Sequence, residues 1–333
     1  MIIDMHAHFT APDKLFAYKA NLLSSRIRSR GPLKLDDELI IKALNEPVHG
    51  GKSHLEQLVE VGTDLQIISP RPYQLMTSEE PPSVVRGFVE ACNSLTARQC
   101  ELFPDKFVPM AALPHAMGTE PKDCLDELDR CVNDLNMGSC LLNPDPSEGL
   151  GMAPPGLGDE YWYPIYEKLV EYDIPALVHS ASCRAHRHNY TLNFIIEESI
   201  AIISLFGSSV FEDFPKLKLI ISHGGGAIPY QIGRFRAARM KRKGKPFEES
   251  LRQLYFDTAL YTQDALEMLF RWVGTDRCMF GTERPGAGTA KDPNTGKWMD
   301  DTRPLIESIP SLTDEDKKMI FEDTAREVFK LKV

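Results

Sequence analysis

The chain begins Met1-Ile2-Ile3-Asp4-Met5-His6-Ala7-His8, a short apolar run that ends in two histidines. Seven further runs of the same kind follow, and a longer segment separates each run from the next. The eight runs span residues 1–5, 65–69, 107–113, 139–142, 176–179, 217–222, 254–258 and 278–281. Because their apolar residues are continuous rather than alternating, the runs are typical of parallel strands that are covered on both faces.

The segments between the runs have helical spacing. Between residues 125 and 135, for example, apolar residues recur every three or four positions, which is the period of a helix that buries one face. Eight strand–helix pairs in 333 residues predict an α/β fold, specifically a (β/α)₈ TIM-type barrel in one domain, residues 1–333. An open, doubly wound sheet is the alternative, because periodicity alone does not show that the sheet closes.

Two segments are longer than a barrel requires. Residues 10–50 have helical patterns and predict a helical insertion after the first strand, over one rim of the barrel. Residues 284–304 are rich in glycine, proline and lysine and predict a long loop after the eighth strand. Loops in these positions build the active sites of barrel enzymes, so we expect residues 284–304 to form an active-site loop.

Composition excludes several classes of protein. Lys and Arg number 38 against 48 Asp and Glu, a net charge of −10, which argues against nucleic-acid partners. No apolar stretch approaches the roughly 18 residues that span a bilayer, and the first residues lack the pattern of a signal peptide, so we expect a cytoplasmic protein without a membrane partner. The seven cysteines include no Cys-x-x-Cys pair, so any metal would be held by histidines and carboxylates.

Polar side chains gather where the predicted strands end. His6 and His8 lie two residues apart in an extended segment, so they face the same side and can hold one ion. The fifth run ends at His179, His223 directly follows the sixth run, and Glu283 lies two residues after the eighth. The carboxyl ends of barrel strands are where such enzymes carry out their chemistry, and this set of residues predicts a metal site there.

The strand ends resemble those of the amidohydrolase superfamily over essentially the whole chain. The similarity is to the branch that contains aminocarboxymuconate-semialdehyde decarboxylase, the resorcylate decarboxylases and 4-oxalomesaconate hydratase. The motifs that carry it are His6-Ala7-His8, His179, His223-Gly224-Gly225-Gly226 and Phe280-Gly281-Thr282-Glu283-Arg284-Pro285. The resemblance implies one divalent metal ion, zinc before manganese, held by His6, His8, His179 and, in one of two interpretations, Glu283. It also implies a small anionic carboxylate substrate. We expect a homo-oligomer, specifically a dimer, with the insertion at residues 10–50 as a contact between its subunits.

The eighth strand departs from the usual pattern of the superfamily. Most members end this strand in Gly-Thr/Ser-Asp, whereas this chain has Glu283. The extra methylene moves the carboxylate about 1.5 Å outward, so Glu283 is either a longer metal ligand or mainly a proton carrier. A glutamate followed by a loop such as residues 286–301 is similar to 4-oxalomesaconate hydratase, which adds water to a carbon–carbon double bond.

The residues are compatible with that chemistry. A zinc-like ion lowers the pKa of a bound water to about 7 and so supplies hydroxide near neutral pH. Glu283 would place or remove the proton on the adjacent carbon. His223 would orient water or stabilise the enolate that develops, and Tyr190 would donate a hydrogen bond to the same oxygen.

Arginines near the strand ends are candidates to bind the substrate's carboxylates. Arg71 follows the second strand, Arg284 follows Glu283, and Arg187 lies in the loop after the fifth strand. Each can form a bidentate pair with a carboxylate, although an arginine on the outer surface is the alternative in each case. Asn143, after the fourth strand, either lines the pocket or caps a turn.

These observations favour a metal-dependent hydro-lyase that adds water to an unsaturated keto-dicarboxylate or keto-tricarboxylate from aromatic degradation. The alternative is a metal-dependent, non-oxidative decarboxylase of the same branch. A hydrolase of a lactone or of a carbon–carbon bond is less favoured, and a catalytically silent barrel is the alternative outside enzymes.

Overall fold

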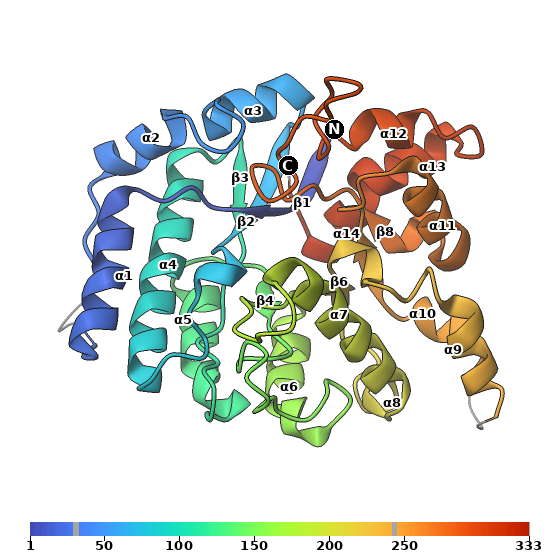
Figure 1. The fold of residues 1–333 in the computed structure, drawn as a ribbon, viewed down its shortest axis with the longest axis horizontal. Coiled ribbons are helices and arrows are strands. Elements are labelled where there is room, and N and C mark those ends of the chain that lie inside the picture. The colour runs from blue at the N-terminus through green and yellow to red at the C-terminus, as the bar shows by residue number, and fades with distance from the viewer. Residues whose placement is uncertain (29–32, 242–244, 333) are drawn as a thin grey trace.

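The structure is a computed structural model that describes residues 1–28, 33–241 and 245–332, and it contains eight short parallel strands (Figure 1). Seven of the strands lie inside the predicted runs, and the first extends beyond its run to His8. The strands are β1 Ile3–His8, β2 Leu65–Ser69, β3 Phe107–Pro109, β4 Cys140–Leu142, β5 Ala176–Val178, β6 Leu219–Ile221, β7 Tyr255–Asp257 and β8 Cys278–Met279.

Helices alternate with these strands and cover the outside of the sheet (Figure 1). Among the described residues, none of the helices combines the length and the apolar character that crossing a membrane requires. The helices are α1 Asp13–Ser25, α2 Asp37–Asn45, α3 His54–Val61, α4 Pro82–Leu102, α5 Leu125–Asn133, α6 Tyr163–Tyr172, α7 Tyr190–Phe206, α8 Val210–Asp213, α9 Ile232–Arg239, α10 Phe247–Leu251, α11 Gln263–Val273, α12 Arg303–Glu307, α13 Asp314–Lys318 and α14 Thr324–Phe329.

Backbone hydrogen bonds close the sheet into a barrel. The ladders run β1-β2-β3 and β4-β5-β6-β7-β8, all parallel, and leave two seams. Across the first seam, Leu141 N donates to Ala111 O at 2.7 Å. Across the second, Met5 N donates to Phe280 O at 2.8 Å and Glu283 N donates to His6 O at 2.7 Å. The closed (β/α)₈ barrel predicted from the sequence is therefore confirmed, and the open sheet is excluded.

The interior of the barrel is filled by side chains from the middle of the strands. Their neighbours in sequence point outward and pack against the helices, for example Leu142, Val178 and Ile221. This two-sided burial explains why the strands are continuous apolar runs. The inward set includes Met5, Ile67, Leu141, Leu177, Ile220 and Met279.

A β-bulge in β1 turns the first histidine toward the same interior. The register of β1 against β2 shifts between Asp4 and Ala7. Met5 packs in the interior core, and the next residue, His6, also faces inward, where its ring lies 5.0 Å from that of His179. A regular strand would place these two consecutive side chains on opposite faces, and a bulge is the ordinary way to re-aim one of them.

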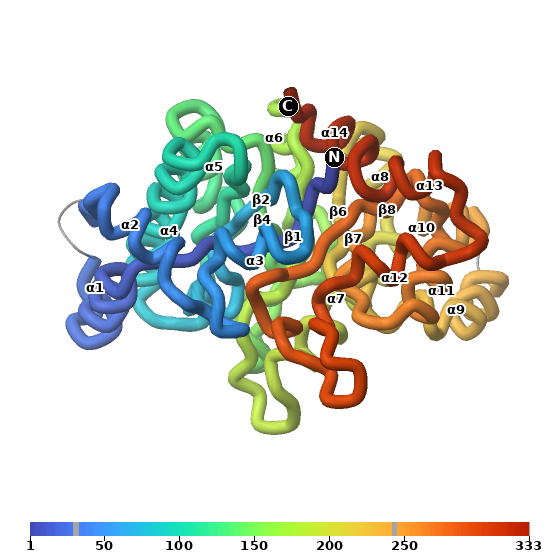
Figure 2. The backbone as a smooth tube through the Cα atoms, turned by 90° about the horizontal axis from the view of Figure 1, so that it is seen from above, coloured from blue at the N-terminus to red at the C-terminus, as the bar shows by residue number. Residues whose placement is uncertain are grey.

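The segment from residue 10 to 50 is helical, and only its end reaches the rim of the barrel. Helices α1 and α2 pack against α4 at the side of the barrel (Figure 1) and share an apolar core with it through Leu22, Ile40 and Phe88, whereas His49 lines the pocket described below. Residues 29–32 of this segment lie outside the described residues. In Figure 2 the orange-red loop between β8 and α12 projects from the body of the barrel, and its first residues reach the pocket described below.

A buried carboxylate holds β1 against its neighbours on both sides. Asp4 accepts hydrogen bonds from Thr282 Oγ1 at 2.6 Å, from Gln66 Nε2 at 2.9 Å and from the backbone N of His6 at 3.1 Å. Burial raises the pKa of Asp4 to about 6, although the hydrogen bonds from Thr282 and Gln66 oppose that change. The residue therefore joins β1, β2 and the end of β8 next to the histidines.

Replacing Asp4 by Ala should lower the free energy of unfolding by about 2–4 kcal/mol, because the donors on Thr282 and Gln66 would be buried without an acceptor. Urea unfolding followed by circular dichroism measures this change. Asp4→Asn keeps an acceptor oxygen and should lose less, and Asp105→Ala, at an exposed position, should change stability by no more than about 0.5 kcal/mol. Equal midpoints for Asp4→Ala and Asp105→Ala would show that Asp4 does not hold the seam.

Candidate active site

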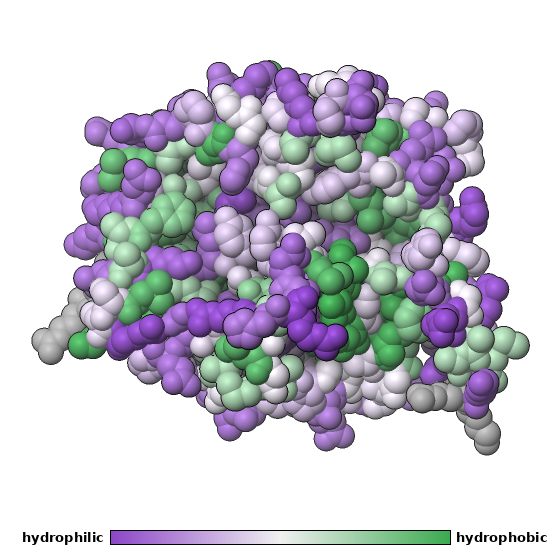
Figure 3. All heavy atoms as spheres, viewed as in Figure 1, coloured by the Kyte–Doolittle hydropathy of each residue, from purple (hydrophilic) through white to green (hydrophobic). Residues whose placement is uncertain are grey.

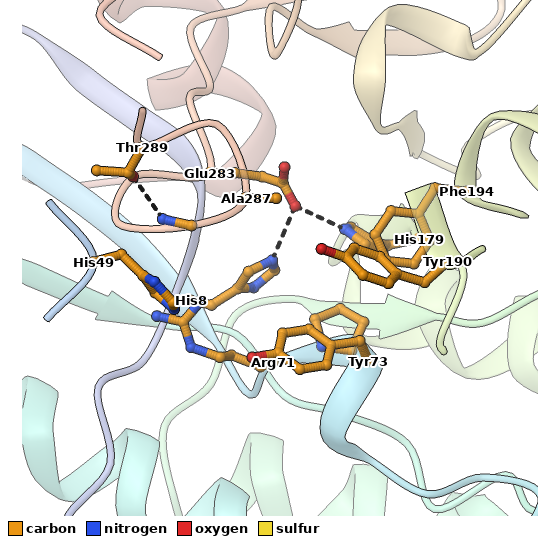
Figure 4. A pocket seen from close by; sticks show the side chains of 12 residues that line it. His8, His49, Arg71, Tyr73, His179, Tyr190, Phe194, Glu283, Ala287 and Thr289 are labelled. Atoms are coloured by element: carbon orange, nitrogen blue, oxygen red, sulfur yellow. Dashed lines mark hydrogen bonds and ion pairs between the residues drawn. The ribbon is translucent and has the colours of Figure 1, made fainter. Parts of the chain in front are cut away.

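Four imidazole rings meet at the carboxyl end of the barrel. His6 and His8 come from β1, and His179 and His223 follow β5 and β6; all four are at least 92% buried. The centroids of five of the six ring pairs lie 4.9–5.5 Å apart. Oε1 of Glu283 lies among their Nε2 atoms, at 3.5 Å from His8 and His223, 3.6 Å from His179 and 3.9 Å from His6. Figure 4 shows Glu283 turned toward His8 and His179.

Each ring is fixed by a hydrogen bond at its other nitrogen, Nδ1. The acceptor for His179 is a backbone carbonyl, which can only accept, so Nδ1 of His179 carries the proton and Nε2 keeps its lone pair. The Nε2 atoms of His6, His179 and His223 are buried and have no hydrogen-bond partner. The Nδ1 contacts are His6 with Asp257 Oδ2 at 2.5 Å, His8 with Ser69 Oγ at 2.9 Å, His179 with Ser180 O at 2.7 Å and His223 with Glu198 Oε1 at 2.8 Å.

This arrangement has the donor set of a divalent metal centre. One ligand atom from each of His6, His8, His179 and Glu283 lies within 4.8 Å of the other three. Three nitrogens and one carboxylate oxygen suit zinc and other first-row divalent ions. Buried nitrogens without a partner are costly in a protein interior, and metal-binding histidines usually form a hydrogen bond through their other ring nitrogen, here Nδ1.

Backbone geometry brings Glu283 into this cluster. Glu283 adopts a left-handed backbone conformation with φ +60°, which is unusual for a residue with a long side chain. Two residues earlier, a Cβ atom on Gly281 would lie 2.9 Å from the Cβ of His6. Only glycine therefore lets β8 approach β1 closely enough to place the glutamate beside the histidines.

Charges in the cluster shift the pKa values in opposite directions. Burial lowers the pKa of His179 to about 4 and that of His8 well below its usual value, which keeps both rings neutral at pH 7. Burial would also lower the pKa of His223, but the carboxylates of Glu198 and Glu283 outweigh it and raise that pKa well above the usual value. Burial would raise the pKa of Glu283, yet His223 and the contacts with His179 and His8 hold it well below the usual value.

Two acidic residues of this centre were not among the candidates from the sequence. Asp257, the last residue of β7, is fully buried and accepts hydrogen bonds from His6 and from the backbone N of Gly224 at 3.0 Å. Its position at the end of a predicted strand was a usable signal. Glu198 belongs to α7, and a glutamate inside a helical pattern gives no sign that it contacts His223.

A pocket of about 320 Å³ opens beside the cluster (Figure 4). Arg71 and Tyr190, both candidates from the sequence, lie in its wall. The loop after β8 contributes Gly286, Ala287 and Thr289. The other lining residues are His8, His49, Pro72, Tyr73, His179, Phe194 and Glu283.

Sequence analysis missed three contributors to this pocket. His49 is exposed and lines the pocket. Tyr73, two residues after Arg71, stacks on Tyr190 with ring centroids 5.9 Å apart. Phe194 packs parallel to His223 at 5.5 Å. The proximity of Tyr73 to Arg71 in the chain was the one signal available for these residues.

Three other candidates lie away from the pocket. Arg284 is 1% exposed, and its guanidinium binds Asp300 at 2.7 Å and Glu60 at 3.0 Å. Its charge is therefore already neutralised by the protein. Arg187 is exposed, and Asn143 accepts a hydrogen bond from the backbone N of Asp145 at 3.1 Å, as a turn-capping residue does; neither residue lines the pocket.

Comparisons with known proteins agree with this geometry. The chain is 35% identical to the 2-keto-4-carboxy-3-hexenedioate hydratase of Sphingobium sp. strain SYK-6, over 99% of this chain and 96% of that protein. The crystal structure of 4-oxalomesaconate hydratase from Rhodopseudomonas palustris superimposes with a TM-score of 0.87 at 35% identity, over 99% and 96% of the two chains. The γ-resorcylate decarboxylase of a Rhizobium species is 26% identical over 72% of this chain and 75% of that protein.

The family model described as amidohydrolase matches residues 3–331, which include all four histidines and Glu283. The match extends over nearly the whole barrel, so it does not depend on the metal-site motifs alone. The chain belongs to the amidohydrolase family.

Proposed function

We propose that this protein is a metal-dependent hydratase, a lyase that adds water to the carbon–carbon double bond of an unsaturated keto-dicarboxylate or keto-tricarboxylate in the degradation of aromatic compounds. The observation that carries the proposal is the carboxylate of Glu283, which lies among four imidazoles and faces a pocket that contains Arg71. The full-length similarity to two hydratases supports it, and both act on substrates of this kind by name.

The proposal includes one divalent ion, zinc in the first place and manganese as the alternative, held by His6, His8, His179 and Glu283. The support is that two of these histidines have a buried Nε2 atom without a hydrogen-bond partner, while Nδ1 of each is already bound. When bound, such an ion supplies Lewis acidity that lets a water molecule ionise near neutral pH.

Arg71 is the residue best placed to bind a carboxylate of the substrate. Its side chain is 91% buried, and its hydrogen bond goes to the backbone O of Pro285 at 3.0 Å. Within the described ranges, no acidic side chain forms an ion pair with it. A buried cation without a counter-ion is unfavourable, so an anionic group in the pocket would stabilise it. Arg284, which already has two carboxylate partners, offers no such site.

The remaining residues would transfer the proton and stabilise the negative charge that develops during the addition. Water adds to the carbon of the double bond that is farther from the substrate's carbonyl group, which leaves an enolate, and the carbon next to the carbonyl group then receives a proton. Glu283 is placed to carry that proton. His223, oriented by Glu198, would stabilise negative charge on the enolate oxygen, and the hydroxyl of Tyr190 in the pocket wall would donate a hydrogen bond to the same oxygen.

A hydration assay in ¹⁸O-labelled water tests the proposed reaction. The metal-loaded protein should remove the ultraviolet absorbance of a conjugated keto-carboxylate and place one ¹⁸O atom in the product. Release of CO₂ from that substrate or from a carboxylated phenol, without incorporation of ¹⁸O, would instead identify a decarboxylase, the activity of the 26% identical relative.

In the same assay, Glu283→Gln should lower turnover at least about 100-fold, because the amide cannot carry the proton. The Michaelis constant should change only a few-fold, since Arg71 still binds the substrate. Glu46→Gln, a substitution at an exposed position, is the matched control and should keep full turnover. Near-normal turnover of Glu283→Gln would remove this residue from the mechanism.

Metal content should depend on the histidines of the cluster. His8→Gln should reduce the content measured by mass spectrometry from about one ion per chain to a small fraction of that value, because a lost ligand weakens binding strongly. His49→Gln changes a histidine of the same pocket outside the proposed ligand set, so it should keep the metal. Equal metal content in the two variants would contradict the proposed ligands.

Replacing Arg71 by Lys should raise the Michaelis constant about tenfold or more, because an ammonium group cannot form the bidentate pair of a guanidinium. Arg187→Lys, at an exposed position outside the pocket, should leave it within about twofold. Steady-state kinetics over a range of substrate concentrations measure both effects. A larger rise in the Michaelis constant for Arg187→Lys than for Arg71→Lys would show that Arg187, and not Arg71, binds the substrate's carboxylate.

A further inference from the structure

The pocket beside the histidine cluster contains one basic residue that has no role in the proposed reaction. His49 is exposed and lines this pocket, and it lies in the turn between α2 and α3 rather than at the end of a strand. Within the part of the chain that the structure describes, neither nitrogen of its ring forms a hydrogen bond or an ion pair. The ring can therefore donate to a ligand without losing an interaction inside the protein.

The turn that carries His49 is held in a fixed conformation. Val48 N donates to Lys52 O at 3.0 Å, and Gly51 N donates to Val48 O at 3.0 Å. Gln57, which lies in α3 and is 1% exposed, donates from Nε2 to the carbonyl O of His49 at 2.6 Å and to that of Lys52 at 3.0 Å. These bonds fix the backbone on both sides of His49, so binding through its ring costs little backbone entropy.

The same turn packs against the loop after β8. A Cβ atom on Gly50, which has φ +90°, would lie 2.9 Å from Cγ2 of Thr289 and 3.1 Å from Cη2 of Trp298. A side chain at this position would push the turn away from the loop. The glycine therefore allows His49 to reach the same pocket wall as Thr289.

The charge of the whole chain does not favour an anionic substrate. Hydrophilic side chains are spread over the face shown in Figure 3, and the net charge of −10 makes the surface unfavourable for an anion overall. Attraction must therefore come from inside the pocket. Among the described residues that line it, Arg71 is the one Lys or Arg, and His49 is the one histidine outside the proposed metal ligands.

The hydroxyl groups of the pocket wall are less suited to this task. The hydroxyl of Thr289 donates to Asp300, and that of Tyr73 already accepts a hydrogen bond from Gln74 Nε2 at 3.1 Å. A neutral hydroxyl also forms a weaker bond with a carboxylate than a cationic nitrogen does. In Figure 4 the ring of His49 and the guanidinium of Arg71 lie at one end of the pocket, and the aromatic rings lie at the other.

We propose that His49 binds a second carboxylate of the substrate, in addition to the carboxylate that Arg71 binds. The inference rests on the proposed function in one respect, namely that the substrate carries at least two carboxylates. Arg71 reaches the pocket from the segment after β2 and His49 from the turn before α3, so carboxylates on separate carbons can each meet a donor. The pair would make the pocket selective for polycarboxylates over monocarboxylates.

Isothermal titration calorimetry with the metal-loaded protein tests the proposal. The probes are 2-oxoglutarate and 2-oxopentanoate, two keto acids of equal chain length that differ by the terminal carboxylate. The wild type should bind 2-oxoglutarate at least about tenfold more tightly. His49→Ala should weaken binding of 2-oxoglutarate about tenfold and change that of 2-oxopentanoate less than about twofold, because one charge-assisted hydrogen bond is lost. His49→Lys keeps a cation and should retain most of the preference.

His186→Ala is the matched control, since His186 is an exposed histidine outside the pocket, and it should leave both dissociation constants within about twofold. Equal weakening of both acids by His49→Ala would indicate general damage to the pocket and would overturn the proposal. An unchanged preference in His49→Ala, or a wild type that binds both acids equally, would overturn it as well.

The titration separates this site from the proposed reaction. If the preference depends on His49 but the protein does not hydrate a conjugated keto-carboxylate, the carboxylate site is supported and the hydratase is contradicted. If hydration occurs and His49→Ala keeps both the preference and the Michaelis constant, the carboxylate site alone is contradicted.

Discussion

The centre depends on the hydrogen bonds that orient its four imidazoles. Each Nδ1 is bound by a different partner: Ser69 on β2, Asp257 on β7, Glu198 on α7, and the carbonyl of Ser180 beside His179 itself. If a ring could rotate, its Nε2 atom could form a hydrogen bond with another group. Fixed in this way, the Nε2 atoms all point toward Glu283, and several separate elements must be in place before they do. Closure of the barrel brings these elements together, because it places β8 beside β1.

The strands and the polar residues at their ends could be predicted from sequence because both follow from local pattern. Continuous apolar runs mark parallel strands, and His6, His8, His179 and Glu283 stand where those runs end. The bulge in β1 has no such signature: Asp4 and Met5 look like ordinary strand residues, yet the register shift beside them allows His6 to face inward. A contact between a helix residue and a strand end, as between Glu198 and His223, is equally absent from local pattern.

The roles of the two buried arginines could not be predicted from local pattern either. Arg71 and Arg284 both follow a strand and both are buried, so the sequence gives them equal claims as substrate ligands. Their difference lies in partners far along the chain. Arg284 meets Asp300 across the loop after β8 and Glu60 on α3, and it stacks on Trp298 at 4.8 Å. It anchors the loop that lines the pocket, whereas Arg71 is left without an acidic partner among the described residues.

Helix α7 reverses the usual distribution of side chains. Its inner face buries polar residues, with Glu198 and Asn193 almost inaccessible, while Leu192 and Ile200 are about half exposed. The candidate active site accounts for the inner face, because Glu198 orients His223 and Tyr190 begins the helix at the pocket wall.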